Sequence, residues 1–284
     1  MRRDRWTLVA AGFAAMSLVA GILHFSVRSA AADQLGFAVD ATGNLYTVDL
    51  TTATATPIGS TGQLIEGLAI SPQGSLFGTD FLGNLFSVSR TTGASTLIGN
   101  TGVGDIEGLS FNGTTLIGTN FSNLGGPTTI YAINTSTAVP TAVTSFSQGP
   151  VRAMAVVNPN TIDVASDSPV SQSLVSVNLL TGTNTSLGQL PSMGAALIAA
   201  LNFGTDGVLY ALDPFGNEFT IASNGAGVLV GNTGGQYWLD LTMASTVLDP
   251  PGVPEPSSMA LLLTAGLGLI GVRAWQKSRG STQS

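Results

Sequence analysis

Two glutamates and an arginine stand at matching places in three similar segments of the chain. Glu66, Glu107 and Arg152 are the second residues of "IEGLAIS", "IEGLSFN" and "VRAMAVV". Carboxylates beside a guanidinium can bind a sugar or a cation, and a carboxylate pair can also act as acid and base in glycoside hydrolysis. The structural alternatives are an arginine that bridges two glutamates of neighbouring repeats, or a polar lining of a wet channel.

The composition removes several other kinds of active site. From Asp33 to Pro254 there is no His and no Lys, and the whole chain has no Cys. Serine-based acyl transfer needs a base, usually His or Lys, and a zinc site needs His or Cys ligands, so neither is expected. The segment "GVGDIEG" leaves a weak calcium alternative through Asp105 and Glu107. No cofactor is predicted.

The same stretch is strongly acidic. It holds two basic residues, Arg90 and Arg152, against fourteen acidic ones, a formal balance of −12. A surface of this sign repels the phosphates of nucleic acid and of anionic lipid. We therefore expect no nucleic-acid partner.

A repeated unit of four short extended segments predicts the fold. "IEGLAISPQGSLFGTDFLGNLFSVSRTTGASTLIGNTG" begins a pattern that returns at Ile106, Val151 and Ile198, with a period of about 40 to 47 residues. The segments are rich in β-branched and aromatic residues and are separated by Gly, Asn, Asp or Pro. Four antiparallel strands per unit indicate an all-β fold, a β-propeller of four-stranded blades.

The two ends of the body, residues 33–248, predict how the ring closes. Gly36–Gly59 matches the last three strands of the unit, and Tyr237–Ala244 matches the first, with Leu239 in the place of Leu68. Together they form a fifth blade whose innermost strand comes from the C-terminal end, which leaves no unpaired sheet edge at the closure. The alternative is an open or larger ring that dimerises.

In such a ring the glutamates and the arginine meet at one mouth of the central channel. Glu66, Glu107 and Arg152 each begin an innermost strand, and Ala199 and Tyr237 are predicted to hold this position in the fourth and fifth blades. Asp80, Asp213 and Asp49 end strands and are expected to cap turns rather than to do chemistry.

The N-terminal residues 1–32 have the pattern of a signal peptide. Three arginines within the first five residues precede a long apolar stretch, and Ala30 and Ala32 fit the small-x-small rule of a cleavage site. We expect a signal helix that is removed, so that the mature chain begins at Asp33. The alternative is an uncleaved membrane anchor.

The C-terminal end predicts a second membrane segment. A Pro-rich linker (249–258) leads into a tail (259–284) in which Met259–Val272 is an uncharged run followed by basic residues. Its fourteen residues would rise about 21 Å as a helix, short of the roughly 30 Å hydrocarbon core, although snorkelling basic side chains cover part of the difference. We expect a transmembrane helix with a cytoplasmic end.

The motif Pro254, Glu255, Pro256, followed by the apolar run and by Arg273, resembles the PEP-CTERM sorting signal of Gram-negative bacteria. The basic residues after the run are more widely spaced than is usual in that family. The resemblance implies recognition by a membrane-embedded exosortase, export through the inner membrane, and temporary anchoring by the tail. It also implies a place at the cell surface or in extracellular matrix, in a producer of exopolysaccharide and biofilm.

The expected function is therefore a non-catalytic binding or structural module. A rigid acidic propeller would present its channel mouth to extracellular polysaccharide, divalent cations or other proteins. The alternative is a glycan-active hydrolase that uses Glu66 and Glu107. The fold does not decide between the two, because propellers host both binding proteins and enzymes.

Overall fold

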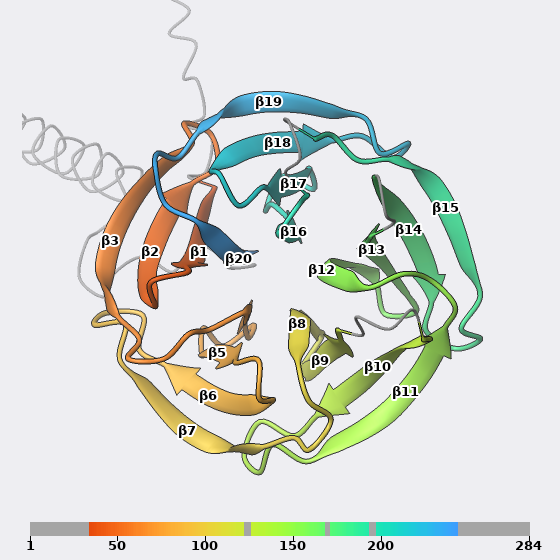
Figure 1. Cartoon of the computed structure of the whole chain (residues 1–284), viewed down its shortest axis with the longest axis horizontal. Helices are drawn as coiled ribbons and strands as arrows, with labels where there is room; N and C mark the ends of the chain where they lie inside the picture. Colours follow the sequence, from red (N-terminus) through yellow and green to blue (C-terminus); the bar gives the residue numbers. More distant parts are fainter. Residues whose placement is uncertain (1–33, 122–125, 168–170, 193–196, 244–284) are drawn as a thin grey trace, which may run out of the picture. The chain divides into compact units, whose positions relative to one another are not determined.

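The computed structural model describes residues 34–121, 126–167, 171–192 and 197–243. Within them twenty strands form five four-stranded antiparallel sheets, arranged as blades around a ring (Figure 1). The predicted five-bladed β-propeller is confirmed. The predicted signal helix, linker and tail helix lie outside the described residues. Among the described residues no helix is long and apolar enough to cross a membrane.

Four blades are each built from consecutive strands. The first contains β4 (Gly67–Ile70), β5 (Leu76–Thr79), β6 (Asn84–Val88) and β7 (Ser95–Asn100). The second contains β8 (Ile106–Asn112), β9 (Thr115–Asn120), β10 (Thr128–Ile133) and β11 (Pro140–Phe146). The third contains β12 (Val151–Asn158), β13 (Thr161–Asp167), β14 (Gln172–Asn178) and β15 (Asn184–Gln189). The fourth contains β16 (Ala200–Phe203), β17 (Leu209–Leu212), β18 (Asn217–Ile221) and β19 (Gly227–Asn232).

The fifth, or closing, blade joins the two ends of the body. β20 (Trp238–Met243) is its innermost strand and pairs with β1 (Leu35–Asp40), which is followed by β2 (Asn44–Asp49) and β3 (Thr54–Ser60). This is the predicted closure by one strand and three. It overturns the alternative of an open or larger ring, because the two ends pair with each other within one chain.

The register of the closing strand differs from the prediction by two residues. Leu68 pairs with Gly78, and Leu241 pairs with Ala38; Gly78 and Ala38 each lie two residues before the aspartate of the next turn. Leu241, and not Leu239, is therefore the counterpart of Leu68. A strand of alternating apolar residues looks the same after a slip of two positions, so the sequence pattern alone did not fix the pairing.

The strand-ending aspartates cap turns, as predicted. The Oδ1 atom of Asp80 accepts hydrogen bonds from the backbone N–H groups of Leu82 (3.0 Å) and Asn84 (2.9 Å). Gly83 between them has a φ of 76°, a left-handed conformation that favours glycine. Asp213 makes the corresponding bonds in the fourth blade, and Asp49 accepts the N–H of Thr51 at 2.8 Å. These carboxylates are committed to the backbone.

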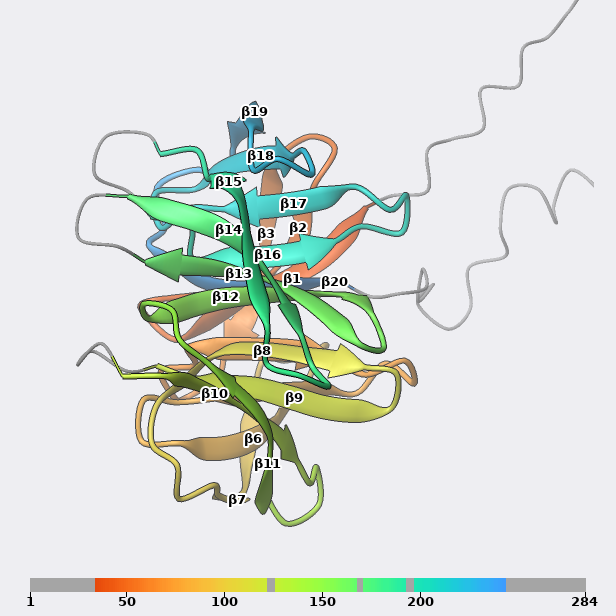
Figure 2. The ribbon, with the colours of Figure 1, turned by 90° about the vertical axis from the view of Figure 1, so that its right-hand side faces the viewer.

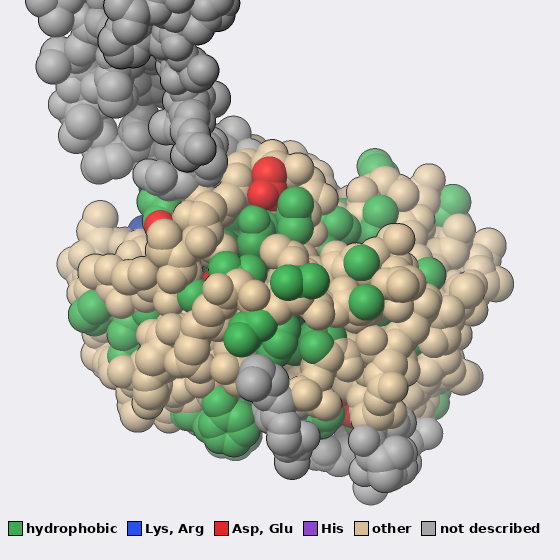
Figure 3. Space-filling model, turned by 90° about the horizontal axis from the view of Figure 1, so that it is seen from above, with side chains coloured by type: hydrophobic (Ala, Val, Ile, Leu, Met, Phe, Trp, Pro, Cys, Tyr) green, Lys and Arg blue, Asp and Glu red, His purple; other side chains and the backbone are tan. Residues whose placement is uncertain are grey.

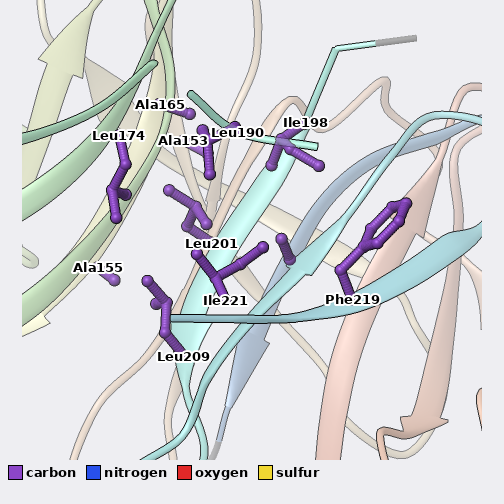
Figure 4. Packing of buried hydrophobic residues seen from close by; sticks show 11 residues of the cluster. Ala153, Ala155, Ala165, Leu174, Leu190, Ile198, Leu201, Leu209, Phe219 and Ile221 are labelled. Carbon is purple, nitrogen blue, oxygen red and sulfur yellow. The ribbon is translucent and has the colours of Figure 1, made fainter. Parts of the chain in front are cut away.

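The hydrophobic core lies between neighbouring blades. Figure 4 shows one such cluster, in which Ala153, Ala155 and Leu174 of the third blade face Leu201 and Ile221 of the fourth. All of these side chains are buried. Burial of this apolar surface drives the packing of blade on blade.

Glycines let each outer strand approach a hairpin turn of the adjacent blade. A Cβ atom on Gly188 of β15 would collide with the backbone oxygen of Asn224, in the turn between β18 and β19. The same kind of contact reaches across the closure, where a Cβ on Gly231 would lie 2.9 Å from the Cβ of Ala53. Similar close approaches join Gly59 to Thr92 and Gly99 to Thr137. The outer strands thus form a belt around the ring.

We expect Gly188→Ala to destabilise the propeller by about 1–3 kcal/mol, because the added methyl group forces two blades apart. Urea unfolding of the purified body measures this change. Gly235→Ala is the matched control, since a Cβ at Gly235 would meet nothing within 4 Å. Equal stabilities of the two variants would show that Gly188 is not closely packed against the turn at Asn224.

The innermost strands β4, β8, β12, β16 and β20 contact one another in turn around the channel. Seen from the side, β8, β12 and β16 run across the middle of the ring (Figure 2). Their last residues line a cavity of about 450 Å³ at one mouth, which includes Met243 and Thr205. Gln34 donates a hydrogen bond to Thr205 Oγ1 at 2.7 Å. Both ends of the described body therefore lie at this mouth, the one at which the inner strands end.

The outer wall is mostly uncharged. In the view of Figure 3, backbone and uncharged polar side chains dominate, with hydrophobic side chains scattered among them and few acidic ones. Leu97 of β7 and Val228 of β19 are examples of outer-strand residues that are more than half exposed. Single exposed apolar residues of this kind are ordinary on protein surfaces. The charged side chains that could bind a ligand lie at the mouths of the channel instead.

Candidate functional site

The first residues of the inner strands converge on a second cavity, at the opposite mouth. It has a volume of about 270 Å³, and Glu66, Glu107, Arg152 and Ala199 lie in its wall, as the repeats predicted. Leu239 holds the corresponding position in the closing blade, so the assignment of that position to Tyr237 was wrong. The remaining wall residues are Leu197, Pro214, Phe215, Tyr237 and Trp238.

β-Bulges aim three of these side chains toward the mouth. The strand register shifts at Glu107 in β8, at Arg152 in β12 and beside Leu239 in β20. A bulge inserts one extra residue and turns its side chain away from the regular alternation of the strand. The repeat thus places a side chain at the channel mouth in each of these blades and leaves its chemistry free to vary.

Arg152 contacts two carboxyl groups. Its Nε donates to Asp167 Oδ2 at 2.8 Å, and its Nη1 lies 3.4 Å from Glu107 Oε2. Its guanidinium also lies over the ring of Phe121, 4.7 Å from the centroid. Asp167 in turn accepts a hydrogen bond from Gln172 Nε2 at 2.9 Å. The arginine therefore joins one glutamate to an aspartate of its own blade, rather than bridging Glu66 and Glu107.

Burial makes the carboxyl groups at this mouth hard to ionise. Burial raises the pKa of Glu107 to about 8, against the opposing effect of the Arg152 charge. Burial and the neighbouring Glu66 raise the pKa of Asp105 to about 7, and burial also raises the pKa of Glu66. Two adjacent carboxyl groups that cannot both ionise share a proton near neutral pH. Asp105 and Glu66 form such a pair.

The opposite wall of the pocket is aromatic. The rings of Phe215 and Tyr237 meet edge to face, with centroids 5.9 Å apart, and the residues are 57% and 52% exposed. The carbonyl of Pro214 accepts the backbone N–H of Trp238 at 2.9 Å, which ties the turn that carries Phe215 to β20. Trp238 is fully buried and packs edge-on against Tyr46, with centroids 5.0 Å apart. The pocket therefore has one acidic and one aromatic side.

Sequence reasoning found part of this site. Asp105 was considered for calcium alone, and Asp167 and Phe215 were not singled out. By strand register Ser166, and not Asp167, holds the place of Asp80 in the third blade, so the repeat gave no signal for Asp167. Across the described ranges, no three His, Cys, Asp or Glu side chains are grouped as a metal site requires. Calcium bound by Asp105, Glu107 and backbone carbonyls stays a prediction.

Comparison with known proteins bears on the C-terminal end. Residues 252–279 match the family of the PEP-CTERM protein-sorting motif. The chain carries a PEP-CTERM sorting motif. The matched span contains Pro254, Glu255, Pro256 and Arg273. A PEP-CTERM motif indicates an exported protein that is sorted through a membrane-anchored stage, and such motifs are generally processed by an exosortase.

Solved structures share the fold of the body. A chain in the crystal structure of a nidogen/laminin complex has a TM-score of 0.50 and 12% identity, over 75% of this chain and 98% of that one. A gluconolactonase from Xanthomonas campestris gives a TM-score of 0.48 and 12% identity, over 72% and 78%. At 12% identity the first of these likenesses shows the fold of the body alone. No curated protein is similar enough in sequence to count as a match.

Proposed function

We propose that this PEP-CTERM protein is an exosortase-sorted module of the cell surface or extracellular matrix that binds exopolysaccharide without catalysis. Its binding site is the pocket formed by Glu66, Glu107, Arg152, Phe215 and Tyr237. The observation that carries the proposal is the pairing of an acidic wall with an aromatic wall in one cavity of about 270 Å³.

A sugar ring matches these two walls. Its C–H face is apolar and packs on aromatic rings, while its hydroxyl groups donate to carboxylates and accept from a guanidinium. Ligand sites in proteins commonly combine apolar or aromatic walls with a few polar groups that fix orientation. The cavity is the size of a small unit of a longer chain, so a polysaccharide would present one or two residues at a time.

The location of the pocket suits a tethered protein. β20 begins at the pocket with Trp238 and ends at the opposite mouth with Met243. The chain continues from Met243 toward the sorting motif. The mouth with the pocket is thus the one from which the chain does not depart. A polysaccharide would reach it both before and after the tail is processed.

Removing the aromatic wall is expected to weaken polysaccharide binding. We expect the Phe215→Ala, Tyr237→Ala double variant to lose at least tenfold in affinity, since an aromatic contact contributes about 0.5–1.5 kcal/mol beyond its burial. Retention of the purified body on immobilised cellulose, alginate and chitosan measures this loss. Phe81→Ala is the matched control, because Phe81 is 54% exposed in a corresponding turn of the first blade and lies outside the pocket. Equal losses in both variants would contradict the proposal.

The hydrolase alternative has one observation in its favour. The pKa of Glu107, raised to about 8 by burial, keeps this side chain protonated at neutral pH, which is the state that a general acid needs. The same polysaccharide panel tests the alternative by release of reducing ends. Activity that Glu66→Gln with Glu107→Gln removes would replace binding by catalysis as the function. A wild-type protein that releases no reducing ends excludes the alternative.

A further inference from the structure

The pocket has an excess of acidic groups over basic ones. Glu66 and Glu107 line it, and the carboxyl group of Asp105 neighbours that of Glu66. Arg152 is the one basic side chain in the described part of this wall, and its Nε is already bonded to Asp167 at 2.8 Å. A ligand that enters therefore meets carboxyl groups whose charge the arginine does not balance.

The polar atoms buried at this mouth are incompletely satisfied. Glu66 Oε2 and Asp105 Oδ1 accept no N–H or hydroxyl of the described residues, and the proton that the two carboxyl groups share is the donor between them. On the other side, the indole N–H of Trp238 has no acceptor in the same described part, although Trp238 is fully buried and lines the cavity. An unpaired buried polar group destabilises the protein. A ligand that brought a positive charge to the carboxyl side and an oxygen to the indole side would favour ionised carboxylates and give the indole N–H an acceptor.

We infer that the ligand of this pocket is a sugar unit that carries a primary ammonium group, as in a partially deacetylated amino-sugar polymer. The inference rests on the proposed function and narrows its ligand class. The ammonium group supplies up to three donors and a positive charge to Glu66 and Glu107. A sugar hydroxyl supplies the acceptor for Trp238, and the apolar ring face lies on Phe215 and Tyr237.

A positive ligand also couples binding to protons. Its charge favours ionised carboxylates, so a proton held at the mouth is released when the ligand enters. The charged groups that face Glu66 and Glu107 from the neighbouring strands and loops are Asp80, Asp105, Arg152, Asp167 and Asp240. Affinity therefore rises with pH in the acidic range and falls again near neutrality, where the sugar ammonium loses its own proton.

Titration calorimetry with the whole body and two matched probes tests the inference. The probes are a glucosamine hexamer and its fully N-acetylated counterpart, which have the same rings with and without ammonium groups. We expect the amine form to bind at least tenfold more tightly at pH 6, and its affinity to rise up to about tenfold from pH 5 to pH 6, as release of one proton predicts. The heat is expected to depend on the ionisation enthalpy of the buffer.

Two variants separate the pocket from the general negative charge of the body. Glu66→Gln is expected to remove most of the preference for the amine form, and Glu107→Gln serves as a second variant if the first unfolds. Asp206→Asn removes a charge near the opposite mouth, where Asp206 bonds Tyr210, and is expected to keep the preference. An equal loss in Asp206→Asn would overturn the inference in favour of non-specific attraction.

The outcomes distinguish the inference from the function on which it rests. Binding of the acetylated and amine forms with equal affinity, sensitive to Phe215→Ala, would overturn the inference and leave the polysaccharide site standing. Absence of binding to either form and to the wider polysaccharide panel would overturn both.

Discussion

Asp240→Ala is expected to destabilise the propeller by about 3 kcal/mol or more. Asp240 is buried, its Oδ2 accepts the backbone N–H of Leu68 at 2.6 Å, and its Oδ1 accepts that of Leu241 at 2.7 Å. Leu68 belongs to β4, so this carboxyl group joins the closing blade to the first blade. Alanine would leave two buried N–H groups without an acceptor, at a cost of about 1–3 kcal/mol each.

The closing blade is the one described blade with a carboxyl group at the position of Asp240. By strand register, its counterparts in the other four blades are small residues, Gly67, Gly108, Ala153 and Ala200. Thr242 of the same strand adds a further bond, because its Oγ1 accepts the N–H of Ile70 at 3.2 Å. β20 has no covalent connection to the strand beside it in its own blade. The hydrogen bonds from Asp240 and Thr242 to the first blade therefore supply part of the stabilisation that a hairpin connection gives to the inner strands of the other blades.

Urea unfolding at neutral pH measures the effect, and Asp240→Asn is the matched control. The amide oxygen of Asn keeps an acceptor for the N–H of Leu68 but leaves that of Leu241 without one, so we expect a smaller loss than for alanine, about 1–3 kcal/mol. Similar losses for the Ala and Asn variants would show that packing, and not hydrogen bonding, makes Asp240 important.

The repeats predicted the blades because each blade obeys the same local rules. Alternating apolar residues make the strands, and an aspartate with a glycine three residues later makes the turn, as at Asp80 and Gly83. These features depend on neighbours in the sequence and are readable from it. The register of β20 is different, since its partner β1 lies about two hundred residues away and the bulge beside Leu239 leaves no mark in the sequence.

The candidate site also contains residues that the repeats predicted and residues that they did not. Glu66, Glu107 and Arg152 were predicted to meet because one position of a repeat maps to one place on a ring, and the cavity contains all three. Asp167 and Phe215 come from the ends of other strands and from turns, where the repeats vary in length. Their arrival at the mouth depends on how the blades pack. That contact between blades is a property of the ring and not of any one repeat.

The second large effect is expected at Glu218, which lies in the core of the fourth blade. Glu218 is fully buried on β18, and neither of its carboxyl oxygens has a hydrogen-bonding partner among the described residues. Burial, with a smaller contribution from Asp49, raises its pKa from 4.5 to about 8. In the unfolded chain this carboxyl group loses its proton near pH 4.5, whereas in the folded chain it keeps the proton until about pH 8.

The stability that depends on the protonated form is therefore complete below pH 4.5 and is lost progressively as the pH rises to about 8. The slope is at most about 1.4 kcal/mol per pH unit. We expect Glu218→Gln to match the wild type near pH 4.5 and to be more stable by roughly 2–4 kcal/mol at pH 8. Urea unfolding from pH 4.5 to pH 9 measures both curves. Parallel curves would contradict the assignment of this pH dependence to Glu218.

The other blades show what this position accepts. Its counterparts by strand register are aliphatic side chains with no exposed surface, Leu45, Leu85, Ile130 and Leu174. Glu218→Leu would restore the residue type of the repeat, so we expect it to exceed the wild type in stability at every pH and to show the same pH profile as Glu218→Gln, flatter than that of the wild type. A Glu218→Leu protein less stable than Glu218→Gln would show that the fourth blade has reshaped its core around the carboxyl group, and that the repeat no longer sets the packing there.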